Sequence, residues 1–253
     1  GIVYQFQLES SKRRLVKTKK TCKRKVNMKK IILLCLILLN GYTNIDLSNN
    51  NIIHQQIFDQ IDIDTYQNIM IVAHPDDETI WGGGHLLKDK YLVICLTNGN
   101  NKTRKKEFNE VMNKTHNQGI ILDYPDKTNN KRDDWKTSYK NIINDLKYLL
   151  SKKQFKTIVT HNPKGEYGHQ HHKMTSTIVT NIVKNLKQTD NLKYFGNYYQ
   201  KNNPVLPMIP TYNKKTLKQK NDLVKYYKSQ KKVCHNLKHM FPYENWISYK
   251  NWK

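Results

Sequence analysis

Short apolar runs alternate with amphipathic segments along most of this chain. Four such runs, each bounded by polar residues, predict buried parallel strands at 69–73, 91–96, 120–122 and 157–160. Longer segments with apolar residues at helical spacing predict helices at 79–90, 103–118, 135–154 and 169–187. This alternation predicts an α/β fold: a Rossmann-like, mostly parallel sheet with helices on both faces. Ligands in such sheets bind beyond the carboxyl ends of the strands, so the residues after each run matter most for function.

The segment 28–41 has a different pattern. Met28 and two lysines precede nine apolar residues, 31–39, and an Asn-Gly pair follows. This order predicts a signal peptide or an uncleaved signal anchor, and the apolar run is shorter than the ~20 residues of an ordinary spanning helix. A buried core helix is the alternative, but the basic residues before the run and the Asn-rich stretch after it favour targeting. We therefore expect a secretory-pathway protein that is secreted or membrane-associated.

The segments around this run lack the strand–helix pattern. Residues 1–27 show no apolar periodicity and are expected to be a disordered or non-native extension. Residues 42–62 are polar and are expected to form a linker. The alternating region then defines one domain, expected at 63–253, a normal size for a single α/β unit.

The strongly basic composition suggests nucleic-acid binding at first, but its details argue against it. The chain has a formal net charge of +24, and five of its 44 basic residues are arginine. Proteins that read phosphates and bases depend on the bidentate arginine fork, whereas lysine and asparagine are scattered here through every segment. We therefore expect no nucleic-acid partner, and the charge instead favours an anionic membrane surface or a phosphate-bearing substrate.

The cysteines limit the kind of metal site that this chain can build. Of four cysteines, Cys95 and Cys234 fall in the predicted domain, too few for a disulfide framework. No Cys-x-x-Cys pair is present. Any metal site must therefore use histidines and carboxylates.

The first concentration of such residues follows the run 69–73. His74, Asp76, Asp77 and Glu78 stand within five positions at the end of a predicted strand. They combine metal ligands with proton acceptors. An acidic turn that caps the next helix would use the same residues, so this cluster alone leaves both interpretations open.

The second concentration follows the run 157–160. His169, His171 and His172 stand together at the start of a predicted helix. His169 and His172 are three positions apart and share a helical face, so the spacing selects these two over His171. Two clusters beyond separate strands predict one shared metal site. Two imidazoles and one carboxylate with an open position are typical of catalytic zinc.

The two clusters resemble the signatures of the LmbE / PIG-L family of zinc-dependent N-acetylglucosaminyl deacetylases. These signatures stand here as AHPDDE at 73–78 and GHQHH at 168–172. Looser similarities extend the resemblance to roughly residues 65–232: 96–99 followed by Arg104 and Glu107, 119–126, 162–168 and 227–230. The resemblance implies an enzyme that removes the acetyl group of an N-acetylglucosaminyl compound, lipid-linked or another glycan.

The resemblance also implies residue roles. His74, Asp77 and His172 match the zinc ligands, Asp76 matches the general base, and His169 matches the electrophilic and proton-donating histidine. As an imidazolium, His169 would stabilise the oxyanion and later protonate the amine. Iron is an alternative to zinc at such a site.

The substrate contacts and the rival functions depend on weaker signals. Arg104, Asp126 and Tyr167 are expected to contact the sugar or the oxyanion. His161 is either a support for the metal ligands or an ordinary strand-end histidine. The rival functions are a non-catalytic glycan- or polyanion-binding protein on the same fold, and a metal-dependent esterase.

Overall fold

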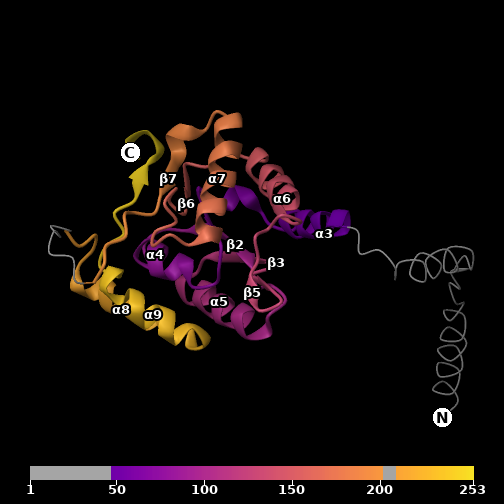
Figure 1. Ribbon diagram of the computed structural model, residues 1–253. Helices are drawn as coiled ribbons and strands as arrows, with labels where there is room; N and C mark the ends of the chain where they lie inside the picture. The colour runs from indigo at the N-terminus through magenta and orange to yellow at the C-terminus, as the bar shows by residue number, and fades with distance from the viewer. Residues whose placement is uncertain (1–46, 202–208) are drawn as a thin grey trace, which may run out of the picture. The chain divides into compact units, whose positions relative to one another are not determined.

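The computed structural model describes residues 47–201 and 209–253, and its centre is a six-stranded sheet (Figure 1). The strand order is β3-β2-β1-β6-β7-β8, in which β8 alone pairs antiparallel with its neighbour. The strands are β1 Asn68–Val72, β2 Tyr91–Thr97, β3 Gln118–Tyr124, β6 Thr157–Thr160, β7 Leu192–Tyr194 and β8 Ile247–Ser248. The predicted α/β fold with a mostly parallel sheet is confirmed.

Helices cover both faces of this sheet (Figure 1). The α-helices are α3 Leu47–Asp59, α4 Asp77–Leu86, α5 Lys102–Thr115, α6 Tyr139–Ser151, α7 Gln170–Asn185, α8 Lys214–Val224 and α9 Lys231–Leu237. Residues of β1 point alternately to the two faces. Ile69 and Ile71 pack in a core with α3, α6 and α7, and Met70 and Val72 pack in a second core with α4, α5, α8 and α9.

Shorter elements complete the described chain. A hairpin pairs β4 Lys127–Thr128 with β5 Lys131–Arg132. Five 3₁₀ turns are η1 Ile63–Thr65, η2 Thr189–Asn191, η3 Lys228–Gln230, η4 Lys238–Met240 and η5 Tyr249–Asn251. Because the hairpin follows β3 directly, it lies at the carboxyl end of the sheet, where ligands are expected.

The polar segment expected as the linker 42–62 contains helix α3, so that prediction was wrong. The buried face of α3 is formed by Asn51, His54 and Phe58 at positions i, i+3 and i+7. Asn51 Nδ2 donates to Asp145 Oδ1 at 2.5 Å, and His54 Nδ1 lies 2.6 Å from Asp145 Oδ2 on α6. Two of the three buried side chains are polar, and a search for apolar periodicity therefore misses the helix.

The predictions for residues 1–27 and for the targeting segment 28–41 lie outside the described residues. Within 47–201 and 209–253, no helix combines the length and apolar character needed to cross a bilayer.

The pairing of β1 with β6 brings the two sequence clusters together. Ile71 pairs with Thr160 in a parallel register, so both strands end at the same edge of the sheet. The chain leaves β1 into the turn before α4, and leaves β6 into the loop before α7. Both turns therefore open on one side, next to the ends of β2 and β3.

Candidate metal-dependent active site

A cavity of about 920 Å³ lies at this edge of the sheet. Seven of the eight residues predicted for the site line it: His74, Asp76, Asp77, Arg104, Asp126, Tyr167 and His169. The eighth, His172, is fully buried and contacts Asp77. The structure therefore brings all of the predicted residues to one place.

A tight turn after β1 aims His74 and Asp77 at the same point. The His74 main-chain N–H donates to Asp77 Oδ2 at 2.8 Å, and His74 Nδ1 lies 3.1 Å from that oxygen. Between them, Asp76 has a φ of 130° and a ψ of −30°, a conformation that non-glycine residues rarely adopt. Strained backbone of this kind is concentrated at functional sites, and here it orients two neighbouring carboxylates.

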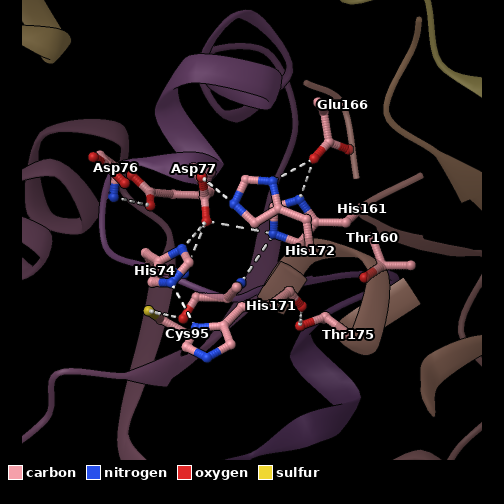
Figure 2. A network of polar contacts seen from close by, with 12 residues as sticks. His74, Asp76, Asp77, Cys95, Thr160, His161, Glu166, His171, His172 and Thr175 are labelled. Atoms are coloured by element: carbon pink, nitrogen blue, oxygen red, sulfur yellow. Dashed lines mark hydrogen bonds and ion pairs between the residues drawn. The ribbon is translucent and has the colours of Figure 1, made fainter. Parts of the chain in front are cut away.

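His172 lies in the first turn of α7, and only one of its two ring nitrogens makes a hydrogen bond. Its Nδ1 donates to Glu166 Oε2 at 2.5 Å, as Figure 2 shows. A neutral imidazole with its proton on Nδ1 has a lone pair on Nε2. That Nε2 is buried, makes no hydrogen bond, and lies 3.3 Å from Asp77 Oδ1. A proton or a metal cation between this nitrogen and the carboxylate would satisfy both groups, and both are metal-ligand types.

The donor set fits a divalent metal. His74 Nδ1 and His172 Nε2 lie 3.1 and 3.3 Å from the two oxygens of Asp77. Ligand atoms about 2.0–2.1 Å from a tetrahedral zinc are ~3.3 Å apart, so each nitrogen lies at a ligand-like separation from one Asp77 oxygen. His74, His169 and His172 also place ring nitrogens within 4.8 Å of one another. The described residues thus include candidate His/Asp ligands, and the donor types suit zinc or iron.

Glu166 and His161 support these ligands. Glu166 Oε2 accepts from His172 and, at 3.0 Å, from His161 Nδ1 (Figure 2). His161 Nε2 in turn accepts from the main-chain N–H of Ala73 at 3.0 Å, and its ring stacks on His172 with centroids 3.8 Å apart. His161 is therefore a support for the ligands, the first of its two predicted roles. Sequence reasoning gave Glu166 no role, although it stands six residues before His172.

Replacing Glu166 with glutamine is expected to weaken metal binding about 10–100-fold, because outer-shell carboxylates fix the tautomer of a ligating histidine. Glu166 Oε2 accepts two imidazole N–H groups, while Oε1 accepts the main-chain N–H of Asn162 at 2.8 Å. The glutamine side chain has one oxygen and one NH₂ group, so its NH₂ group must face at least one of the N–H groups that Glu166 accepts. Competition against a chromophoric chelator measures the affinity. Glu110→Gln on α5 is the control, and equal affinities of both variants would contradict the assigned role of Glu166.

The two aspartates of the turn have opposite electrostatic environments. Burial raises the pKa of Asp76 to about 8, although the Arg104 guanidinium 3.6 Å away opposes the shift. Burial also disfavours the Asp77 carboxylate, but the positive charge that the facing His172 and His161 rings carry when protonated lowers the pKa of Asp77 well below its usual value. Asp77 is therefore a permanent carboxylate, and Asp76 can exchange a proton near neutral pH.

His169 caps the N-terminus of α7 and faces the metal ligands. Its ring centroid lies 4.3 Å from that of His172 and 4.7 Å from that of His74, and its Nδ1 makes no hydrogen bond. Burial, with the neighbouring imidazoles, lowers the pKa of His169 to about 2. The ring is therefore neutral until a proton is delivered to it.

The spacing argument that selected His169 and His172 over His171 was wrong in leaving His171 out of the site. Helix α7 begins at Gln170, so His169 is outside the helix and the i, i+3 spacing does not apply. His171 is fully buried, stacks on Trp135 with centroids 4.1 Å apart, and places its Nδ1 3.0 Å from His74 Nε2.

The three predicted substrate residues have different environments. Arg104 is buried and donates to the main-chain oxygen of Pro75, so it also holds the turn that carries Asp76. Asp126 accepts a hydrogen bond from Arg132 of the hairpin at 2.5 Å. Arg132 was not predicted from the sequence. Tyr167 is 41% exposed on the cavity rim, where it is free to contact a ligand.

The sequence of this chain is similar to that of a viral protein. A sequence relative, an uncharacterized protein of Acanthamoeba polyphaga mimivirus, is 38% identical over 56% of this chain and 66% of its own length. The chain thus spans just under two thirds of that relative.

Two solved structures have a similar fold. The 4-carboxy-2-hydroxymuconate hydratase of Pseudomonas putida has a TM-score of 0.50 at 13% identity, over 68% of this chain and 83% of its own. A conserved protein of Thermus thermophilus has a TM-score of 0.50 at 19% identity, over 73% and 96%. Because a hydratase has this fold, the reaction must be argued from the site.

The family comparison covers the site itself. The profile described as PIG-L, GlcNAc-PI de-N-acetylase, matches residues 69–183. This range includes β1, β6 and both histidine clusters. Its match supports a deacetylase-type hydrolase in general. Residues 69–183 are a domain of the PIG-L family.

Proposed function

We propose that this chain is a zinc-dependent N-deacetylase that hydrolyses the acetamide of an N-acetylglucosaminyl compound to acetate and a free amine. The main support is Nε2 of His172, which is buried, makes no hydrogen bond and faces Asp77. Nδ1 of His74 lies beside the same carboxylate, and both His74 and Asp77 line the cavity. These three residues would hold the metal, and iron is the alternative ion. The cavity volume is within the range of sites that bind small molecules or a sugar unit.

The residues around the proposed ligands suit acetamide hydrolysis. A divalent metal held here would supply Lewis-acid activation of water and of the acetyl carbonyl. Asp76, which lines the cavity next to the ligand Asp77, would accept the proton of the attacking water. His169 would donate a hydrogen bond to the developing oxyanion and, after receiving a proton, pass it to the leaving amine. Arg104, Asp126 and Tyr167 would contact the sugar.

Acetate release tests this proposal. The zinc-loaded chain is incubated with N-acetylglucosaminyl lipids, glycosides and chitooligosaccharides and with O-acetyl sugars, and acetate and free amine are quantified. Equal amounts of both, abolished by a chelator, are the expected result. Release from O-acetyl sugars alone would support the metal-dependent esterase, and no release by folded, zinc-loaded protein would overturn the proposal.

A second function is favoured by a lysine-rich groove between α8 and α9. This groove has a volume of about 960 Å³ and an apolar floor that includes Leu217, Val224 and Phe241. Six lysines border it: Lys214, Lys218, Lys225, Lys228, Lys231 and Lys238. Helix α9 separates the groove from the active-site cavity, which its Val233 and Leu237 line. We propose that this face binds an anionic membrane surface and so presents lipid-linked substrates to the site.

Vesicle binding is expected to depend on these lysines and on salt. Each lysine near an anionic bilayer contributes about 1 kcal/mol, so the triple change Lys214→Gln, Lys218→Gln and Lys231→Gln should weaken binding to phosphatidylserine vesicles about 100-fold. Cosedimentation at increasing salt measures this. Lys136→Gln, Lys147→Gln and Lys184→Gln, on exposed positions elsewhere, form the control. Equal binding by both triple variants would refute the groove as the docking face.

A further inference from the structure

The two ring nitrogens of His74 face different partners. Nδ1 lies 3.1 Å from Asp77 Oδ2, on the side of His172, and Nε2 lies 3.0 Å from His171 Nδ1 (Figure 2). A neutral imidazole binds a metal through the nitrogen that lacks the proton. If Nδ1 of His74 is the ligand atom, then its Nε2 must carry a proton, and that N–H needs a buried acceptor.

The hydrogen bonds of His171 make it such an acceptor. Its Nε2 lies 2.7 Å from the main-chain oxygen of Asp133, which can only accept, so this nitrogen carries the proton. In the neutral ring, Nδ1 is then a lone pair, directed at His74 Nε2. The ring is fully buried and stacked on Trp135 at an interplanar angle of 9°, which fixes its orientation.

Two other side chains lie near His74 Nε2, and both are farther from it than His171 Nδ1. Arg132 Nη1, 3.4 Å away, is a donor and cannot accept the proton. Asp126 Oδ1 is a carboxylate acceptor but lies farther away, at 3.3 Å, and is shared with Arg132 Nη1, which donates to it at 2.5 Å. His74, Asp126 and His171 could hold a second metal by their spacing, but the Arg132 guanidinium already places a positive charge against the first two.

We infer that His171 is a positioning residue that fixes the tautomer of His74 through the chain from the Asp133 carbonyl to His171 to His74. It does for His74 what Glu166 does for His172, so each histidine ligand has its own outer partner. The inference rests on the proposed function only insofar as His74 is a metal ligand, and it concerns metal binding rather than the substrate.

Two variants separate the acceptor role from packing. In His171→Asn the side-chain oxygen takes the place of Nδ1 and can accept from His74. In His171→Gln the amide takes the place of Nε2 and can still donate to Asp133, but the acceptor toward His74 is lost. Zinc affinity of the full chain is measured by chelator competition, with thermal melting as the check of folding. We expect His171→Gln to bind zinc about 10–100-fold more weakly, and His171→Asn to bind within a few-fold of the wild type.

The outcomes are distinct. Equal affinities in both variants, whether unchanged or equally weakened in folded protein, would overturn the acceptor role. Two zinc ions per wild-type chain, with one lost in both variants, would replace it with a second metal site. Histidine ¹⁵N spectra of the zinc-loaded wild type need no variant, and a His74 protonated on Nδ1 would also overturn the inference. If the zinc affinities of the two variants follow the expected order but the wild type releases no acetate, the deacetylase proposal is refuted and the role of His171 stands.

Discussion

Changing Asp76 to asparagine is expected to lower kcat for deacetylation by about 10²–10⁴-fold, the usual contribution of a general base. Asp76 is 4% exposed, lines the cavity and is adjacent to the proposed ligand Asp77. Asparagine has almost the same shape and is among the side chains that tolerate positive φ, so it keeps the turn in place while losing the proton acceptor. Acetate release at saturating substrate measures the change.

The metal content of this variant distinguishes chemistry from structure. Asp76 is not among the proposed ligands, so the Asp76→Asn protein should bind one zinc with nearly wild-type affinity. His172→Ala is the matched contrast, because it removes the ligand nitrogen and should lose zinc and activity together. A base must be deprotonated, so wild-type activity should rise with pH through the pKa of Asp76, and the variant should lack that rise. Retention of more than about a tenth of kcat by zinc-loaded Asp76→Asn would exclude Asp76 as the base.

The parts of this site that could be predicted from sequence are those encoded locally. An apolar run followed by His, Pro and Asp marks both the end of a strand and a set of metal ligands. Because the carboxyl ends of parallel strands lie at one edge of the sheet, the ligands that follow different strands come together there. His74, Asp77 and His172 could be predicted for this reason. The i, i+3 argument wrongly excluded His171, because the helix starts at Gln170, one residue after His169, and helix ends are set by capping details that periodicity does not show.

The parts that could not be predicted depend on tertiary contacts between polar residues. Helix α3 packs through Asn51 and His54, which bond to Asp145 about ninety positions away. Arg132 reaches Asp126 and His74 because a two-stranded hairpin folds back over the cavity. Such contacts leave no apolar signal, and the pattern along a single chain does not show which polar residues pair.

Changing Glu244 to glutamine is expected to lower the free energy of unfolding by about 3–5 kcal/mol, because it removes one partner of a buried ion pair. Lys220 is fully buried, its Nζ lies 2.6 Å from Glu244 Oε1, and its other hydrogen bonds go to the main-chain oxygens of Ile80 and Phe241 at 2.7 and 3.1 Å. Without the carboxylate, the lysine charge has no opposite charge beside it. Urea unfolding measures the loss.

The pH dependence of this effect has a definite sign. Burial opposes the charge of Glu244, yet Lys220 and His85 hold the pKa of Glu244 at about 2, below its ordinary value of 4.5. A lowered carboxyl pKa contributes stability that is complete above about pH 4.5 and is lost as the pH falls toward 2. The difference between wild type and Glu244→Gln should therefore shrink over that range.

The double variant Glu244→Gln with Lys220→Met should recover much of the loss, because the unpaired charge is gone. Asp222→Asn, in the exposed pair with Lys225, is the control expected to show no measurable change. Lys220 of α8 also donates to Ile80 of α4, so the pair is expected to hold these helices together. If Glu244→Gln has the same free energy of unfolding as the control, or if its loss of stability is unchanged at pH 2, then the pair does not have this role.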